Sequence, residues 1–214
     1  IKKSLVSYYE HNKATKGDRI VDRILAGETC ALVSDAGSPA ISDPGEDLVR
    51  LCAENGVTVC AIPGPCALVT ALAVSGLPTG RFTFEGFLSV GKRSRREHLQ
   101  SLLEETRTMI FYEAPHKLCR TLADMAAVFG GDRSLSLCRE LTKIHEEVRL
   151  TTFADAIAYY ENTPPRGEFV LVVAGAVPQQ EAQLTLEEAA ERVRQYVADG
   201  QKLTQACKTV AAET

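Results

Sequence analysis

The stretch TCALVSDAGSPAISDPG, residues 29–45, contains the sharpest pattern in the sequence. It begins with Thr29–Val33, a continuous apolar run of strand length, and continues as Ser34–Gly45, a loop rich in Gly, Ser, Pro and Asp. The loop is long, because strand-to-helix connections usually take about two to six residues. In open α/β sheets, ligands bind where such loops follow the carboxyl ends of strands. The stretch predicts a buried strand followed by either a ligand-binding loop or a capped turn without a ligand.

The side chains of this loop suit a ligand site. Gly37 lets the backbone approach a ligand closely, and Asp35 and Ser38 can hydrogen-bond an amine or a hydroxyl. Pro39 and Pro44 stiffen the loop, so that less order must be gained on binding.

The pattern around the loop predicts a first α/β domain over residues 1–77 with a mainly parallel sheet. Apolar strand runs without alternation, separated by helices, are typical of a parallel sheet covered on both faces. The expected strands are Ser4–Tyr9, Thr29–Val33 and Val57–Ile62, and the expected helices are Asp18–Ala26, Glu46–Glu54 and Cys66–Ser75.

After the linker Gly76–Gly80 the predicted strands are short and close together in the sequence. This pattern predicts a second α/β domain over residues 81–176 with a mixed sheet. Its expected strands are Phe82–Phe87, Thr108–Tyr112, Ser134–Cys138, Glu147–Phe153 and Glu168–Ala174, with helices at Lys92–Glu105, His116–Val128 and Ala154–Glu161. A polar linker, Gln179–Leu184, then leads into a helical extension over residues 183–214, with helices Thr185–Val197, capped by Thr185, and Leu203–Ala212.

The composition of the chain argues against several classes of protein. The net charge of −4 argues against a protein that coats nucleic acid, although it allows a local basic patch. No apolar run reaches the roughly 18 residues of a membrane span. The seven cysteines form no C-x-x-C pair and mostly lie in apolar runs, which favours buried, reduced thiols of a cytosolic protein over disulfides or a metal site.

The ends of two further predicted strands contain groups that could bind a ligand or act in catalysis. Ile62–Ala67 opens a helix whose free amides favour an anion or a carboxylate, although taken alone the segment favours a tight turn with close helix packing. Phe111–Lys117 gathers the phenol of Tyr112, the carboxylate of Glu113 and the imidazole of His116.

A compact basic patch, Lys92–Arg96, stands out in an acidic protein. Such a patch can hold phosphates, and the alternative is a solvated helix start. Positive charge near a helix N-terminus opposes the helix dipole, which favours a functional reason for it.

Five segments in this order and spacing resemble the ribosomal-RNA ribose methyltransferase branch of the tetrapyrrole methylase superfamily. They are Ser34–Gly45, Pro63–Ala67, Phe111–Lys117, Arg139–Glu147 and Arg166–Val173, and the resemblance covers roughly Ser7 to Val173. It implies two α/β domains with S-adenosylmethionine held between them, a homodimer and a cytoplasmic location. It also implies 2′-O-methylation of a cytidine in the decoding region of small-subunit (16S) ribosomal RNA.

The sequence departs from that branch at its start. The family's first strand, with a glycine–proline loop that closes the cofactor pocket, and its glutamate–aspartate–threonine–arginine segment have no counterpart here. The first domain is therefore expected without its first strand and helix.

The resemblance implies site residues. The cofactor residues are Ser34, Asp35, Ala36, Gly37, Ser38, Pro65, Cys66, Ala67, Tyr112 and Glu113. The candidates for catalysis are Asp35, Glu113 and His116, and those for RNA phosphates are Lys92, Arg93, Arg95 and Arg96. Two alternatives stay open: a porphyrinoid methyltransferase acting on uroporphyrinogen or a precorrin, and a non-catalytic module that binds a nucleotide-like ligand.

Overall fold

The computed structural model describes residues 4–9, 12–177 and 186–212. The chain divides into two compact units, residues 1–176 and residues 177–214. Within the described ranges, no helix has the length and apolar character needed to cross a bilayer. No three His, Cys, Asp or Glu side chains of the described part gather closely enough to hold a metal ion.

A five-stranded mixed sheet forms the centre of the first unit, in the order β1-β2-β5-β3-β4. The strands are β1 (Phe82–Phe87), β2 (Thr108–Glu113), β3 (Ser134–Arg139), β4 (Glu147–Thr152) and β5 (Phe169–Val173). β1 and β2 are parallel, and β5 is antiparallel to both β2 and β3. The carboxyl ends of β1, β2 and β3 therefore meet at one edge, called the carboxyl edge below. The mixed sheet expected for residues 81–176 is confirmed.

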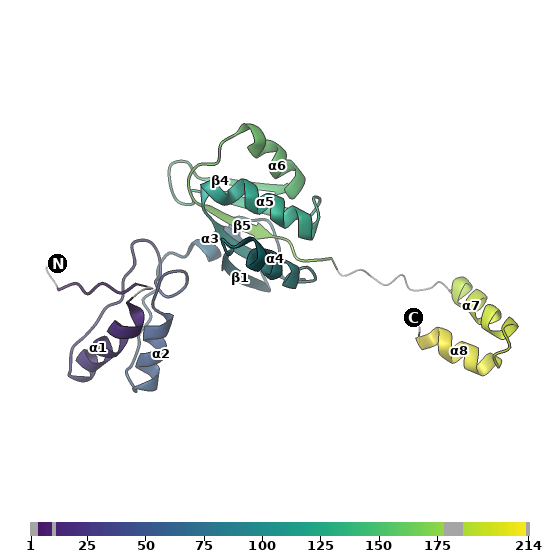
Figure 1. The fold of residues 1–214 in the computed structure, drawn as a ribbon, viewed down its shortest axis with the longest axis horizontal. Helices are drawn as coiled ribbons and strands as arrows, with labels where there is room; N and C mark the ends of the chain where they lie inside the picture. The colour runs from purple at the N-terminus through teal and green to yellow at the C-terminus, as the bar shows by residue number, and fades with distance from the viewer. Residues whose placement is uncertain (1–3, 10–11, 178–185, 213–214) are drawn as a thin grey trace. The chain divides into compact units, whose positions relative to one another are not determined.

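Helices cover both faces of this sheet (Figure 1). α4 (Lys92–Ser101), α5 (Pro115–Phe129) and α6 (Phe153–Asn162) pack on one face, and α3 (Ala67–Val74) packs on the other. Because successive side chains of a strand point to opposite faces, Met109 and Phe111 lie in the core under α4–α6, whereas Ile110 lies under α3. The two faces of β2 thus serve two separate cores.

Local signals fix the ends of the helices that cover the sheet. Pro115 takes the first turn of α5, where its missing N–H costs nothing, and Gly130, with φ of 91°, ends that helix. Thr152 caps α6, because its hydroxyl accepts a hydrogen bond from the Asp155 N–H at 3.2 Å.

The N-terminal part of the first unit is built from helices and loops. α1 (Lys13–Leu25), which begins earlier than predicted, and α2 (Glu46–Glu54) pack through a small apolar cluster. Its buried members are Ile20, Val21, Leu48 and Cys52.

The strands predicted for residues 1–77 are wrong, and with them the mainly parallel sheet. No described residue before Phe82 lies in a strand, so Ser4–Tyr9, Thr29–Val33 and Val57–Ile62 run without ladder hydrogen bonds. Val33 and Ile62 remain 74% and 84% exposed. The physical reason is pairing, because a run becomes a strand only where a neighbour supplies ladder hydrogen bonds, and none of these three runs has such a neighbour among the described residues.

The second unit is a helical hairpin. α7 (Leu186–Ala198) and α8 (Leu203–Ala212) pack on each other, with Ala206 and Val210 buried. Gly200, with φ of 92°, lies in the turn between them. The predicted linker Gln179–Leu184 and the cap Thr185 lie outside the described residues.

All seven cysteines are free, but burial divides them. Cys52 and Cys138 are buried and Cys66 is half-buried. The expectation of buried thiols is wrong for Cys30, Cys60, Cys119 and Cys207, which are exposed. Cys30 and Cys60 are exposed because the runs that contain them form no strand.

Candidate cofactor site

The loop that follows Val33 contacts the loop that precedes α3. The Ser38 N–H donates to the Pro65 carbonyl oxygen at 2.9 Å, and the Ser38 hydroxyl donates to the same oxygen at 3.3 Å. Gly37 has φ of 78°, and a Cβ there would lie 3.0 Å from the Pro65 oxygen. A Cβ on Gly64 would lie 3.1 Å from the Ser38 hydroxyl. The loops approach so closely that Gly37 admits no larger residue without strain.

A second contact joins the start of α3 to the end of β2. The Tyr112 hydroxyl oxygen accepts a hydrogen bond from the Leu68 N–H at 3.0 Å. Edge-on contacts with Phe84 and Phe87 hold the Tyr112 ring, at centroid distances of 5.0 and 5.6 Å. Pro65 contacts Ser38, and Leu68, which directly follows Ala67, contacts Tyr112. The three segments expected to hold the cofactor, Ser34–Ser38, Pro65–Ala67 and the end of β2 at Tyr112, therefore lie next to one another.

The electrostatics of Tyr112 agree with this arrangement. Burial raises the pKa of the Tyr112 phenol, and the nearby Cys66 and Asp43 raise it further. The Leu68 N–H acts in the opposite direction because it stabilises the phenolate. The phenol is therefore protonated at neutral pH and remains a neutral hydrogen-bonding group beside the two loops.

The residues present fit S-adenosylmethionine, judged by their exposure and chemistry. Asp35, Ala36 and Gly37 are exposed, and so are Pro65 and Ala67, whereas their anchors Ser34 and Ser38 are half-buried. The Ser34 hydroxyl donates to the carbonyl oxygens of Ala36 and Gly37 at 3.1 and 3.0 Å, which fixes the loop backbone. The site offers a free carboxylate for an amine or a hydroxyl and a bare glycine backbone for close approach.

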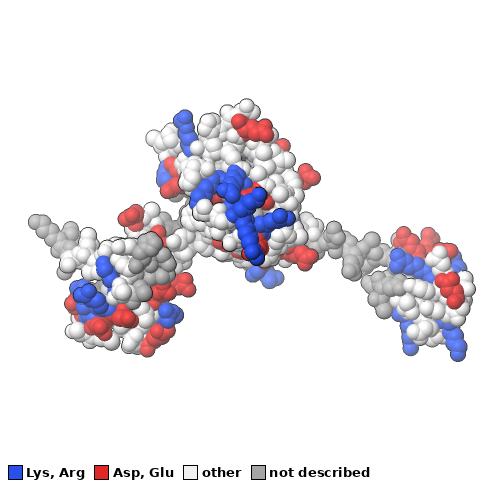
Figure 2. All heavy atoms as spheres, in the orientation of Figure 1, with Lys and Arg blue, Asp and Glu red and all other residues white. Residues whose placement is uncertain are grey.

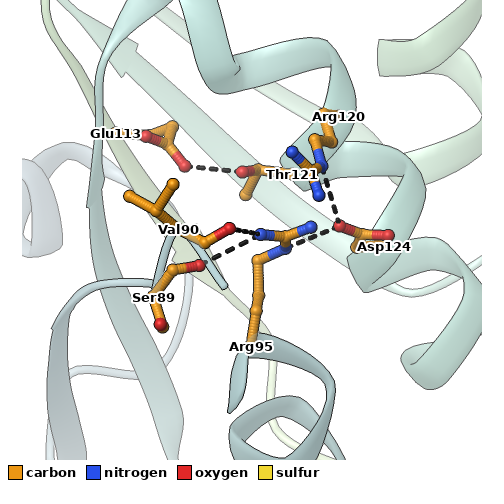
Figure 3. Close-up of polar contacts among 7 residues, drawn as sticks. All are labelled: Ser89, Val90, Arg95, Glu113, Arg120, Thr121 and Asp124. Carbon is orange, nitrogen blue, oxygen red and sulfur yellow. Dashed lines mark hydrogen bonds and ion pairs between the residues drawn. The ribbon is translucent and has the colours of Figure 1, made fainter. Parts of the chain in front are cut away.

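Glu113 lies apart from these loops, on the other face of the sheet. Its carboxylate accepts hydrogen bonds from the Thr121 hydroxyl at 2.5 Å and from the Ala114 N–H at 2.8 Å, and the residue is 4% exposed (Figure 3). The signal was in the sequence, because neighbours in a strand point to opposite faces, so Tyr112 and Glu113 cannot both face α3.

The three residues expected to act in catalysis are therefore not brought together. Asp35 lies in the first loop, Glu113 is buried against α5, and His116 is exposed in the first turn of α5. No hydrogen bond or ion pair joins any two of them among the described residues.

Arg95 is a structural residue, which corrects its assignment to RNA phosphates. Its guanidinium donates to Asp124 at 2.6 Å and to the carbonyl oxygens of Ser89 and Val90 at 3.0 Å each, and Figure 3 shows it enclosed among these groups. The residue is only 4% exposed. Arg95 lies four residues before the buried Leu99, so helical spacing already put both on the inner face of α4.

The other basic residues of the patch lie on the surface, where Arg93 pairs with Glu97 at 2.7 Å and Arg120 lies 3.9 Å from Asp124. Lys92, Arg93 and Arg96 are exposed, and Arg120 of the neighbouring α5 is exposed as well. Figure 2 shows basic side chains gathered over α4 and α5. Because α4 and α5 both begin at the carboxyl edge, this charge lies at the end of the sheet where Tyr112 lies. We call Lys92, Arg93, Arg96 and Arg120 the basic rim.

Comparison with known proteins identifies the class. Residues 3–157 match the family described as Tetrapyrrole (Corrin/Porphyrin) Methylases. The solved structure of the methyltransferase CobJ matches with a TM-score of 0.57 and 18% identity over 75% of this chain and 70% of that one. Cobalt precorrin-4 methyltransferase CbiF matches with 0.52 and 17% over 74% and 70%. At these identities the structures support the fold alone.

The sequence relatives are closer. Ribosomal RNA small subunit methyltransferase I of Synechocystis sp. is 46% identical over 209 residues, which cover 98% of this chain and 75% of the relative. The protein of the same name from Mycobacterium tuberculosis is 42% identical over 97% of this chain and 71% of its own length. These matches define an S-adenosylmethionine-dependent methyltransferase. The chain belongs to the ribosomal RNA small subunit methyltransferase I family of tetrapyrrole methylases.

Proposed function

We propose that this protein transfers a methyl group from S-adenosylmethionine to a ribose 2′-hydroxyl of small-subunit (16S) ribosomal RNA, at a cytidine of the decoding region. One observation carries the proposal. The Ser38–Pro65 and Leu68–Tyr112 hydrogen bonds join the three segments expected to hold the cofactor. The relatives' names support ribosomal RNA as the substrate.

The rate of this reaction depends mainly on how the reacting atoms are aligned. The cofactor supplies a sulfonium-bound methyl carbon: a carbon–oxygen bond forms as the carbon–sulfur bond breaks, and the hydroxyl proton passes to a base. The protein must hold the ribose oxygen in line with that bond and exclude water. The exposed carboxylate of Asp35 and the bare backbone at Gly37 position the cofactor, and Tyr112 forms the wall beside α3.

A base is needed because a ribose hydroxyl is a poor nucleophile. Among the three candidates, Asp35 lies within a cofactor segment and His116 lies exposed at the carboxyl edge. Glu113 is occupied by Thr121 and Ala114. We propose Asp35 or His116 as the proton acceptor and assign Glu113 to fixing the start of α5.

The basic rim supports RNA over a porphyrinoid. Lys92 and Arg93 lie in the first turn of α4, where positive charge opposes the helix dipole, so the dipole does not explain their presence there. Phosphodiesters of a nucleic acid are the ligands that such exposed cations bind. In this proposal Lys92, Arg93 and Arg96 contact the RNA backbone and Arg95 does not.

The test is methylation with isotope-labelled S-adenosylmethionine, offered purified small ribosomal subunits or uroporphyrinogen. We expect label on a ribose of the RNA and none on the porphyrinoid. Because Asp35 is also proposed to hold the cofactor, Asp35→Asn, which keeps an acceptor oxygen, is compared with His116→Ala. The base is the residue whose variant loses turnover at saturating cofactor. Labelled uroporphyrinogen would contradict the proposal, and cofactor binding without turnover on either substrate would support the non-catalytic alternative.

We further propose a homodimer in the cytoplasm, as the resemblance implies. Light scattering on the purified chain gives the mass that tests the dimer.

A further inference from the structure

Two adjoining hollows lie at the carboxyl edge, outside the segments assigned to the cofactor. Their volumes are about 320 and 230 Å³, and Arg139 and Arg166 line both. Tyr159 and Tyr160 of α6 line the larger hollow, and His145 lines the smaller one. We call the two together the Arg139–Arg166 hollow.

The strand register places this hollow near the methyl-transfer site. Arg139, at the end of β3, pairs with Phe169 of β5, and Phe169 pairs with Glu113 at the end of β2. Two steps between strands separate Arg139 from Glu113, which is about 10 Å. The hollow therefore lies on the same edge as Tyr112, at a distance that neighbouring nucleotides of one RNA strand can span.

The charges of the hollow favour an anion. Arg139 and Arg149 share Glu147: Arg139 contacts one of its carboxylate oxygens at 2.9 Å and Arg149 the other at 2.6 Å. The hydrogen bond from Arg149 lowers the pKa of Glu147, so this carboxylate is ionised at neutral pH and balances one of the two arginines. Arg166 is exposed and has no hydrogen bond or ion pair within the described residues.

The carboxylates on the far side of the smaller hollow are already engaged. Glu140 accepts hydrogen bonds from the Lys143 ammonium at 3.0 Å and from the Glu168 N–H at 2.9 Å. The Glu168 carboxylate accepts from the same ammonium at 2.9 Å. Lys143 offsets part of their negative charge, which leaves Arg166 as the unpaired cation facing the hollow.

The backbone around Arg166 is held in an unusual conformation. Gly167 has φ of 79°, and a Cβ there would lie 2.4 Å from the Glu140 Cγ. Glu140 and Thr142 also have positive φ, 50° and 64°. Such strain persists only where the surroundings enforce it and is common at ligand sites. Here it fixes the turn that presents Arg166.

We propose that the Arg139–Arg166 hollow binds a phosphodiester of the RNA strand that carries the target nucleotide. The guanidinium groups of Arg166 and Arg139 donate to the phosphate oxygens, and the rings of Tyr159 and Tyr160 line the space beside it. The Tyr159 ring lies 3.7 Å from the Arg149 guanidinium and Tyr160 is 8% exposed, so these rings form the wall of the hollow beside the phosphate. This inference rests on the proposed function and adds a substrate site to it.

The test measures the affinity of the full chain for a fluorescein-labelled RNA segment of the decoding region, by anisotropy between 50 and 200 mM salt. Arg166→Ala should weaken binding about tenfold. It should also lower the slope of log affinity against log salt by about 0.7, the share of one phosphate contact on a single strand. Arg166→Lys should keep most of the affinity. The matched control is Arg50→Ala, which removes an exposed arginine of α2 and should change neither quantity.

Affinity for S-adenosylmethionine separates the outcomes. We expect Arg166→Ala to bind the cofactor like the parent. An unchanged RNA affinity and salt slope in Arg166→Ala would overturn the RNA site and leave the proposed function standing. An equal loss of cofactor and RNA affinity would also overturn it, because the hollow would then serve the cofactor. A parent chain that neither binds the RNA nor methylates small subunits would overturn the proposed function itself.

Discussion

Two regions of the first unit contain similar apolar runs and give them different structures. Phe169–Val173 is β5, the middle strand of the sheet, and every residue of it is buried. Thr29–Val33 and Val57–Ile62 have a similar length and apolar character but form no strand. The edge strand β4 is intermediate, with Val148 and Leu150 exposed. An apolar run becomes a buried strand only where neighbours on both sides supply ladder hydrogen bonds and helices cover its faces.

A matched pair of isoleucines gives the largest expected effect. Ile110 in β2 is 0% exposed and Ile62 is 84% exposed. Ile110→Ala should lower the free energy of unfolding by about 2–5 kcal/mol, because it leaves a cavity under α3. Ile62→Ala should change it by less than about 0.5 kcal/mol. Urea unfolding followed by circular dichroism measures both, since the chain has no Trp. Equal losses would mean that Val57–Ile62 is packed as tightly as β2.

A pair of arginines repeats the comparison for charge. Arg95 pairs with Asp124 while its side chain is 5% exposed, whereas Arg50 on α2 pairs with Glu54 while 60% exposed. Arg95→Ala should destabilise the fold by about 3 kcal/mol, because it orphans two carbonyl oxygens and a half-buried carboxylate. Arg50→Ala should cost under about 1 kcal/mol. The same unfolding assay decides, and a stable Arg95→Ala variant would return Arg95 to the candidates for RNA binding.

Tyr112 links the two regions, and its hydroxyl can be removed without its ring. Tyr112→Phe keeps the contacts with Phe84 and Phe87 but leaves the Leu68 N–H without its acceptor. We expect a loss of about 1 kcal/mol in stability. Amide hydrogen exchange should speed up at Leu68 and not in β5. Unchanged exchange at Leu68 would show that this hydrogen bond does not hold the loop.

The smallest effect is a pH dependence. Arg107 holds the Glu105 carboxylate by three hydrogen bonds, and these bonds, with a smaller contribution from the charge of Arg107, lower the pKa of Glu105 to about 2. Because this pKa lies below the usual value of 4.5, the pairing stabilises the fold above pH 4.5 and is lost as pH falls toward 2. Solvent screening limits its contribution to about 1 kcal/mol.

Glu105→Gln should therefore narrow the difference in stability between pH 5 and pH 2.5, measured by thermal unfolding at each pH. Glu28 is the control in the N-terminal region. It also pairs with an arginine, Arg23, but its side chain is 52% exposed, and Glu28→Gln should change the acid profile less. A larger change for Glu28→Gln would contradict the comparison.

The sequence predicts the sheet region well and the N-terminal region poorly, for a physical reason. The five strands and their helices follow from local patterns bounded by Gly and Pro, such as Pro115 at the start of α5. Whether Thr29–Val33 pairs depends on neighbours that no local pattern reveals. The Ser38–Pro65 contact joins residues 27 positions apart, so only a known resemblance could place the two loops together. By contrast, the alternation of side chains along β2 separates Glu113 from Tyr112. The helical spacing along α4 likewise separates Arg95 from Arg96, so both distinctions could have been predicted from the sequence.

The central claim is that loops 34–38 and 63–66, held against each other and against Tyr112, form the cofactor site. Titration calorimetry with S-adenosylmethionine tests it most directly, on the parent, Gly37→Val and Gly56→Val. Both glycines have positive φ, but a Cβ meets Pro65 only at Gly37 and finds nothing within 4 Å at Gly56. We predict that the parent and Gly56→Val bind alike and that Gly37→Val binds at least about tenfold more weakly. Equal affinity in all three, or no binding by the parent, would contradict the claim.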